Sequence, residues 1–85
     1  MIYENISNEC RTFAILLTSK FSLFTLTSLI DPIRIANNCS GKTLYQWEFL
    51  SAVGGGVVSS DEITVQTKAI STVDTHWDTV FVCSG

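Results

Sequence analysis

A short apolar run followed at once by a helix-forming stretch is the feature that most constrains this chain. Residues 13–18 (FAILLT) are apolar almost throughout, and Ser19 and Lys20 separate them from residues 21–41 (FSLFTLTSLIDPIRIANNCSG). In the second stretch apolar residues recur at steps of three and four, the period of a helix with one apolar face. A buried strand, a tight turn and an amphipathic helix open an α/β unit. The sequence therefore predicts an α/β fold.

The ends and the middle of this helix carry signals of their own. Ser22 is a good N-cap, and Gly41 can take the left-handed conformation that ends a helix. Pro32 has no N–H to donate and crowds the carbonyl of Ser28, so the helix is either kinked there or stops and restarts with Asp31 as a new cap. We expect a kinked but continuous helix, and the restart is the alternative.

Length and composition limit the chain to one small domain. It has 85 residues, of which 46% are hydrophobic and 15% are charged, and this apolar excess suggests surfaces that are meant to be covered. No apolar run reaches the roughly 18 residues of a membrane span. Residues 1–11 lack the basic segment and the apolar core of a secretory signal. We expect a cytoplasmic location and no membrane contact.

Cysteine and charge patterns argue against several classes of protein. Cys10, Cys39 and Cys83 are widely spaced, and His76 is the only histidine, so we expect neither a disulfide framework nor a metal site, and no cofactor. Five basic residues are scattered among eight acidic ones, with a net charge of −3. This balance does not predict a nucleic-acid-binding surface.

Residues 44–53 (LYQWEFLSAV) predict a second strand. Tyr45, Trp47 and Phe49 alternate with Gln46 and Glu48, which is typical of a strand with one buried face near the edge of a sheet. Strand, helix and strand then form a right-handed crossover with the two strands parallel. We expect the three aromatic side chains in the core, and stacking on an effector is the alternative.

A glycine run and a predicted hairpin follow. Residues 54–56 (GGG) are reminiscent of a phosphate loop, but such a loop opens onto a helix, and the next residues favour a strand. We therefore expect a flexible turn. Residues 57–60 and 63–66 predict a β-hairpin around Asp61 and Glu62, with a bent continuous strand as the alternative.

Two runs without alternation, residues 13–17 and 79–83 (TVFVC), are typical of interior strands covered on both faces of a parallel sheet. Between the hairpin and the last run, residues 67–77 are polar and irregular, with a short helical turn expected near residues 71–74. Sheets of this kind bind ligands beyond the carboxyl ends of their strands. The last strand ends with the chain, which favours the first half of a larger domain.

Several motifs in this order resemble a known family. They are residues 31–37 (DPIRIAN), residues 41–47 (GKTLYQW), the pair Gly54-Gly55, and residues 78–85 (DTVFVCSG). Together they resemble the N-terminal domain of AraC-type transcription regulators whose sensor is a DJ-1/PfpI-like domain, also described as class I glutamine-amidotransferase-like. The resemblance covers residues 13–85, and the motif DPIRIAN is its most specific part.

The resemblance implies a flavodoxin-like three-layer sandwich with a mainly parallel sheet, about twice the length of this chain and followed by a helix-turn-helix domain. We therefore expect a partial, truncated version in the order β-α-β-β-β. Residues 1–11 would be a loose leader and residues 12–85 the first half of the domain. The DNA-binding domain is absent from this chain, so DNA would be a partner only through that missing part.

Two departures from the family pattern bear on catalysis. Enzymes of the DJ-1/PfpI type place a glutamate early in this helix, and that position falls on Thr25, which cannot serve as the acid. Their nucleophilic cysteine would lie beyond residue 85. Ser84 stands where the regulators have the first glycine of a pair. We therefore expect no catalytic residue, and an effector-pocket rim formed by Thr25, Cys83, Ser84 and Gly85.

The remaining chemically suggestive residues have simpler explanations. Cys83 ends an apolar run and is expected to be buried rather than nucleophilic. His76 with Asp74 and Asp78 is expected to form a solvated loop rather than part of a catalytic triad.

Asp31 and Arg34 are three residues apart on the expected solvated face of the helix. They can pair with each other there. The alternative is that they contact the missing half of the domain or a partner subunit.

These features favour a non-catalytic effector-sensing and dimerisation domain of an AraC-type regulator, a homo-oligomer that binds a small molecule. The alternative is a DJ-1/PfpI-type enzyme, such as a hydrolase, a deglycase or an isonitrile hydratase-like protein, whose nucleophile lies beyond residue 85. A third possibility is a remnant without an independent role. An open sheet edge predicts that the isolated chain associates or is poorly ordered.

Overall fold

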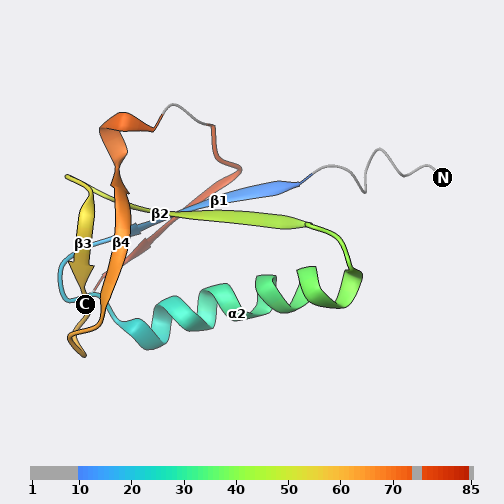
Figure 1. Ribbon diagram of the computed structural model, residues 1–85, viewed down its shortest axis with the longest axis horizontal. Helices are drawn as coiled ribbons and strands as arrows, with labels where there is room; N and C mark the ends of the chain where they lie inside the picture. The colour runs from blue at the N-terminus through green and yellow to red at the C-terminus, as the bar shows by residue number, and fades with distance from the viewer. Residues whose placement is uncertain (1–9, 74–75, 85) are drawn as a thin grey trace.

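A five-stranded, mainly parallel sheet carries one long helix on one of its faces (Figure 1). The computed structural model describes residues 10–73 and 76–84. Its elements, in chain order, are β1 (Arg11–Leu17), α2 (Leu23–Ser40), β2 (Tyr45–Ser51), β3 (Gly55–Val58), β4 (Thr64–Ala69), the 3₁₀ helix η1 (Ile70–Thr72) and β5 (Thr79–Cys83). The α/β class with a mainly parallel sheet is confirmed, and the observed order, β-α-β-β-β-β, has one strand more than the expected β-α-β-β-β.

The strand order in the sheet is β3-β4-β2-β1-β5. β1 is parallel to β2 on one side and to β5 on the other, so Ile15 lies between Phe49 and Phe81. The order β2-β1-β5 is that of flavodoxin-like sheets, in which the winding direction reverses at the first strand. The central position expected for the first strand is therefore confirmed.

The outer strands join this parallel core less extensively. β4 runs parallel to β2 but pairs with it only at Leu50 and Ser51. β3 pairs with β4 in antiparallel fashion along its whole length. The hairpin prediction is thus correct, the bent continuous strand is wrong, and the hairpin turn contains Glu62 with a φ of 67°.

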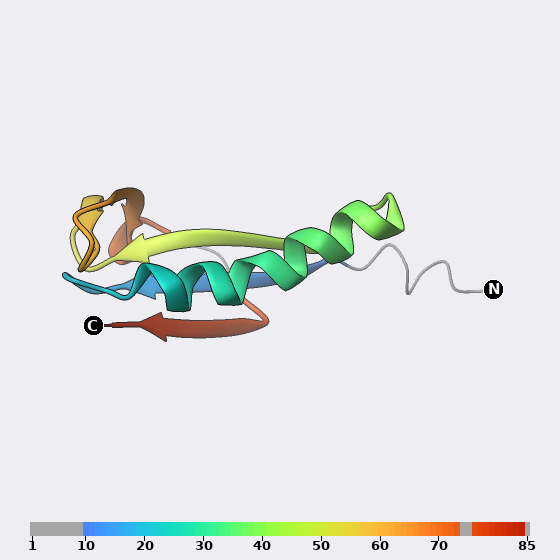
Figure 2. The same ribbon diagram turned by 90° about the horizontal axis from the view of Figure 1, so that it is seen from below.

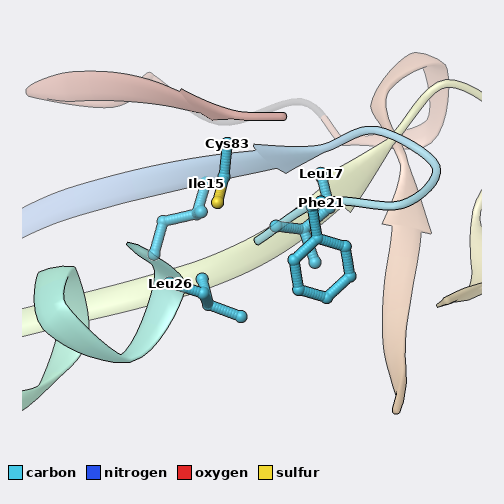
Figure 3. Packing of buried hydrophobic residues seen from close by; sticks show 5 residues of the cluster. All are labelled: Ile15, Leu17, Phe21, Leu26 and Cys83. Atoms are coloured by element: carbon cyan, nitrogen blue, oxygen red, sulfur yellow. The ribbon is translucent and has the colours of Figure 1, made fainter. Parts of the chain in front are cut away.

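The core lies between α2 and the sheet face that it covers (Figures 2 and 3). Figure 3 shows its five central side chains, which come from β1, the turn after it, α2 and β5: Ile15, Leu17, Phe21, Leu26 and Cys83. Figure 2 shows α2 lying along β1 and β2. The apolar stripe of the helix accordingly faces the sheet, as its spacing predicts.

Both ends of α2 lie where the sequence predicts them. The side chain of Ser22 caps the first turn, and Gly41 ends the helix with a φ of 70°. The helix is continuous through Pro32, so the alternative of a stop and restart is wrong. No helix in the described ranges is long and apolar enough to cross a membrane.

The opposite face of the sheet differs from expectation. No helix of the described residues covers it, so these residues form two layers rather than three. Val80 and Val82 are 55% and 65% exposed. In the described part of the chain β5 pairs only with β1, so it is an edge strand and not the interior strand that its unbroken apolar run predicts.

Smaller differences concern segment boundaries. Arg11, assigned to the leader, is the first residue of β1, while residues 1–9 lie outside the described residues. Gly55 and Gly56 begin β3 rather than form a flexible turn. The helical turn near residues 71–74 is a 3₁₀ turn at Ile70–Thr72, and Asp74 lies outside the described residues.

Candidate functional site

The turn from β1 to α2 lies at the carboxyl ends of the strands and is tied to its neighbours on both sides. The Thr18 N–H donates to the Cys83 carbonyl of β5 at 3.2 Å. On the other side, the Lys20 N–H donates to the Val58 carbonyl at 2.8 Å, and Phe21 forms an isolated bridge with Ser59. The turn therefore holds the end of β1 between β5 and β3.

Ser22 forms hydrogen bonds with Thr25 and Cys83, two of the residues predicted to form the effector-pocket rim. Its side-chain Oγ accepts a hydrogen bond from the Thr25 N–H at 3.2 Å, and its carbonyl accepts one from the Cys83 Sγ at 3.6 Å. Thr25 and Ser84 are exposed, whereas Cys83 is buried. Gly85, the fourth predicted rim residue, lies outside the described residues.

The Cys83 thiol is a core group. It is 2% exposed, and its sulfur lies beside Ile15 and above Leu26 (Figure 3). Burial raises the pKa of the Cys83 thiol, because the apolar surroundings disfavour the thiolate. A nucleophilic cysteine needs the opposite shift. The expectation that Cys83 is buried is confirmed.

An open groove of about 390 Å³ lies at the carboxyl ends of β1 and β2. Its walls carry apolar and hydroxyl side chains and no ionisable ones: Leu16, Leu17, Thr18, Ser19, Ser51, Ala52, Val53, Gly54, Gly56 and Val57. This is the edge of an α/β sheet at which ligands usually bind. The chemistry of the walls suits a small, mainly apolar molecule with groups that hydrogen-bond to hydroxyls.

Ser51 fixes one wall of this groove. Its Oγ lies 2.6 Å from the Thr67 Oγ1 and accepts a hydrogen bond from the Gly54 N–H at 2.9 Å. The first contact joins the end of β2 to β4, and the second holds the loop after β2 against that end. Ser51 and Thr67 were not predicted as site residues, and the position of Thr67 directly after the predicted strand at residues 63–66 was the usable signal.

A second hollow, of about 560 Å³, lies at the amino ends of the strands. It is lined by Thr12, Tyr45, Gln46, Trp47, Glu48 and Trp77. The Glu48 carboxylate is already paired with the Lys68 ammonium at 2.6 Å. Because it lies away from the carboxyl ends, this hollow is the weaker candidate for a ligand site.

The aromatic residues of β2 belong to the packing. Trp47 and Phe49 are partly buried against the core, and the ring of Tyr45 stacks on Phe13 with 5.7 Å between centroids. The core placement predicted for them is confirmed for Trp47 and Phe49.

In the polar segment before β5, Asp78 has a structural role. Asp78 Oδ2 accepts a hydrogen bond from the Thr12 N–H at 2.8 Å, which joins the start of β5 to β1. His76 is exposed, and Asp74 lies outside the described residues. Among the described residues, no group of three His, Cys, Asp or Glu side chains could hold a metal ion.

Asp31 and Arg34 pair with each other, as predicted, through a 3.3 Å hydrogen bond from Arg34 Nε to Asp31 Oδ1. Their side chains are 60% and 51% exposed. An ion pair this exposed contributes little to stability.

Comparison with known proteins finds relatives of this chain among transcription regulators. No protein-family model matches the chain. It is 36% identical over 75 residues to the HTH-type transcriptional regulator GbdR of Pseudomonas aeruginosa, with 88% of this chain and 20% of that protein covered. It is 34% identical over 85 residues to the HTH-type transcriptional regulator GlxA of Rhizobium meliloti, with 100% of this chain and 26% of that protein covered. The chain is homologous to a segment of AraC-type transcription regulators.

A solved structure agrees on the fold. The crystal structure of an AraC family transcriptional regulator from Pseudomonas putida superposes with a TM-score of 0.78 at 24% identity, covering 88% of this chain and 40% of that one. The chain spans about a fifth to a quarter of the length of the AraC-type relatives that it matches in sequence. The resemblance drawn from the motifs is therefore confirmed at the level of the regulator family.

Proposed function

We propose that this chain is the non-catalytic, effector-sensing and self-associating part of an AraC-type regulator with a DJ-1/PfpI-like sensor domain. The observation that carries the proposal is its relation to helix-turn-helix regulators. DNA would be bound by a helix-turn-helix domain outside these 85 residues. The protein would act in the cytoplasm, where it can reach DNA.

The residues at the end of β1 support a role without catalysis. Thr25 stands where the resemblance to DJ-1/PfpI enzymes expects a glutamate, and a hydroxyl cannot replace that acid. Cys83 is buried, and the raised pKa of its thiol keeps it neutral at physiological pH. Neither residue is suited to begin an acyl-transfer or hydrolytic reaction.

The groove between the ends of β1 and β2 supports a sensing role. Its volume of about 390 Å³ lies within the range of small-molecule sites, about 300–1,000 Å³. Thr25 and Ser84 are exposed near the same end of the sheet, on the β5 side of β1. Neither residue lines the groove, so in the proposal they would form, with Cys83 and Gly85, a separate rim on the β5 side of β1.

Exposed apolar side chains support self-association. Phe24 is 79% exposed and Val82 is 65% exposed. Side chains of this size gain about 1.5–3 kcal/mol when they are fully buried. Their exposure on two separate elements suits a protein that packs against further surfaces.

DNA binding by the whole gene product tests the regulator role. The purified protein that contains this chain should retard DNA from upstream of its own gene in a gel-shift assay, and should not retard DNA of unrelated sequence at the same salt concentration. Absence of binding to any promoter DNA would reject the regulator role.

Thermal melting of the same protein against a metabolite panel tests the sensing role. A ligand present at 100 times its Kd should stabilise the folded state by about 2.7 kcal/mol. Ala52→Trp, which fills the groove, should abolish the shift. Ile63→Trp, at an exposed position outside the groove, should preserve it. A shift that survives Ala52→Trp would place the effector elsewhere.

A further inference from the structure

The groove at the carboxyl ends of β1 and β2 has one wall from the turn after β1 and another from the loop after β2. Thr18 and Ser19 belong to the first wall, and Ala52 and Val53 belong to the second. Both segments lie at the same end of the sheet (Figures 1 and 2). All four residues are exposed, so a small molecule in the groove can reach each of them.

The hydroxyl protons beside the second wall are already used within the protein. Thr67 Oγ1 donates to the Gly55 carbonyl at 2.7 Å. Because a hydroxyl has a single proton, the 2.6 Å hydrogen bond between Ser51 and Thr67 is donated by Ser51 Oγ. Ser51 Oγ also accepts from the Gly54 N–H, and Ser51 is only 4% exposed. Ser51 and Thr67 therefore shape the groove and leave ligand binding to other groups.

The first wall carries the accessible hydroxyl groups, those of Thr18 and Ser19. The backbone around them is fixed, because the Thr18 N–H donates to the Cys83 carbonyl and the Lys20 N–H donates to the Val58 carbonyl. A hydroxyl can both donate and accept a hydrogen bond. This wall can accordingly bind an alcohol or a carbonyl group of a ligand.

The groove offers no counterion to a charged ligand. None of the described residues that line it is ionisable, and Lys20, which follows Ser19 in the turn, is not among them. A charged group that leaves water for an apolar surface loses its hydration, and without a counterion this costs more than the burial of a neutral polar group. The groove therefore disfavours charged groups in contact with Leu16 or Val57.

We propose that the groove binds an uncharged effector with an apolar body and one alcohol or carbonyl group, which forms hydrogen bonds with Thr18 and Ser19. The apolar body would lie against Leu16, Val53 and Val57. The inference rests on the sensing part of the proposed function and adds the chemical class of the effector.

Three probes with the same six-membered ring test this class. Cyclohexanol is neutral, cyclohexanecarboxylate is negative and cyclohexylammonium is positive at neutral pH. Each is titrated into the whole protein that contains this chain, and the methyl NMR signals of Val53, assigned by Val53→Ile, report binding. Cyclohexanol should have the lowest Kd, at least about fivefold below that of either charged probe. The methyl signals of Ile35, which is exposed on α2 outside the groove, should not shift.

Removal of a hydroxyl tests the polar contact. Thr18→Val keeps the shape of the side chain and should raise the Kd for cyclohexanol about fivefold, and Ser19→Ala should have a similar effect. Thr64→Val is the matched control, because Thr64 is exposed and does not line the groove. The control should leave the Kd unchanged. A Kd that is unchanged in both groove variants would reject the contacts with Thr18 and Ser19.

An added charge tests whether the neutral walls set the preference. Ala52→Asp places a carboxylate in the second wall, at an exposed position. Cyclohexylammonium should then bind most tightly of the three probes, because the groove now supplies a counterion. Circular dichroism verifies that the variant folds. An unchanged order of the three Kd values in Ala52→Asp would reject the role of charge in the groove.

The outcomes separate this inference from the proposed function. Tightest binding of a charged probe to the native protein, with shifted Val53 signals, rejects the uncharged class and leaves the sensing role of the groove intact. Val53 signals that no probe shifts at millimolar concentration reject the inference as well. The sensing role itself is tested by the metabolite panel with Ala52→Trp, and the regulator role by promoter binding.

Discussion

The side chain of Asn37 brackets the backbone of Tyr45. Asn37 Nδ2 donates to the Tyr45 carbonyl at 2.9 Å, and Asn37 Oδ1 accepts from the Tyr45 N–H at 3.0 Å. The same oxygen accepts from the Leu44 N–H at 2.8 Å. One amide at the end of α2 thus satisfies three backbone groups at the start of β2. This gives a physical role to the last residue of the DPIRIAN motif.

Replacing Asn37 by alanine should destabilise the fold. Because Asn37 is partly buried, Asn37→Ala leaves partly buried backbone groups without partners, which costs about 1–3 kcal/mol in the free energy of unfolding. The matched control is Asn38→Ala at the next, exposed position, which should change it by less than about 0.5 kcal/mol. Urea unfolding of both variants measures the difference. Equal effects would contradict the bracketing role of Asn37.

Asp78, the first residue of the motif DTVFVCSG, should stabilise the fold through its contact with β1. Asp78→Ala removes the acceptor for the Thr12 N–H and should lower the free energy of unfolding by about 1 kcal/mol, since the site is partly open to water. Asp78→Asn retains a side-chain oxygen and should cost less. Thermal unfolding ranks the two variants, and equal losses in Asp78→Asn and Asp78→Ala would show that the charge, rather than the hydrogen bond, matters.

The first strand, the helix and the second strand could be predicted because their signals are local. Ser22 and Gly41 mark the helix ends, and Tyr45 and Trp47 alternate with polar residues. The restart at Pro32 was excluded only by the structure. Pro32 lies at an exposed position, the packing of Leu26 and Ile30 anchors the first half of the helix to the sheet, and the hydrogen bonds of Asn37 to Tyr45 anchor the second half to β2.

The layers and the groove could not be predicted, because they depend on long-range contacts. An unbroken apolar run predicts burial on both faces, yet Val80 and Val82 of β5 are exposed, since no described helix covers them. The groove exists because the Phe21–Ser59 bridge folds the hairpin against the turn after β1. Neither partner of this bridge has a sequence signal that specifies the other.

The two neighbouring glycines before β3 should tolerate alanine differently. Gly54 and Gly55 have φ values of 81° and 77°, so alanine is strained at both, by about 1–2 kcal/mol. A Cβ on Gly54 would also lie 2.9 Å from the Ala69 backbone nitrogen, whereas a Cβ on Gly55 would meet nothing within 4 Å. Gly54→Ala should therefore lower the melting temperature more than Gly55→Ala. Similar losses would mean that the backbone conformation alone selects glycine here.

The buried thiol of Cys83 should make stability depend on alkaline pH. Burial raises its pKa in the folded state above that of a free thiol, roughly 8.5. Above that value the unfolded chain releases the proton while the folded chain retains it, so the free energy of unfolding falls as pH rises towards the raised pKa. Below the free-thiol value this contribution is constant.

The contribution of Cys83 can be isolated by comparing how steeply the free energy of unfolding changes with pH in the native chain and in two cysteine variants. Cys83→Ala lowers stability at every pH by leaving a small cavity, but it should remove a slope of up to about 1.4 kcal/mol per pH unit in the alkaline range. Cys39→Ala, at an exposed position on α2, should keep that slope. Urea unfolding at neutral pH and at two alkaline pH values measures it for the three proteins. The core formed with Ile15 and Leu26 surrounds the thiol. If the free energy of unfolding depended on pH in the same way in the native chain and in Cys83→Ala, Cys83 would ionise as freely in the folded protein as in the unfolded chain.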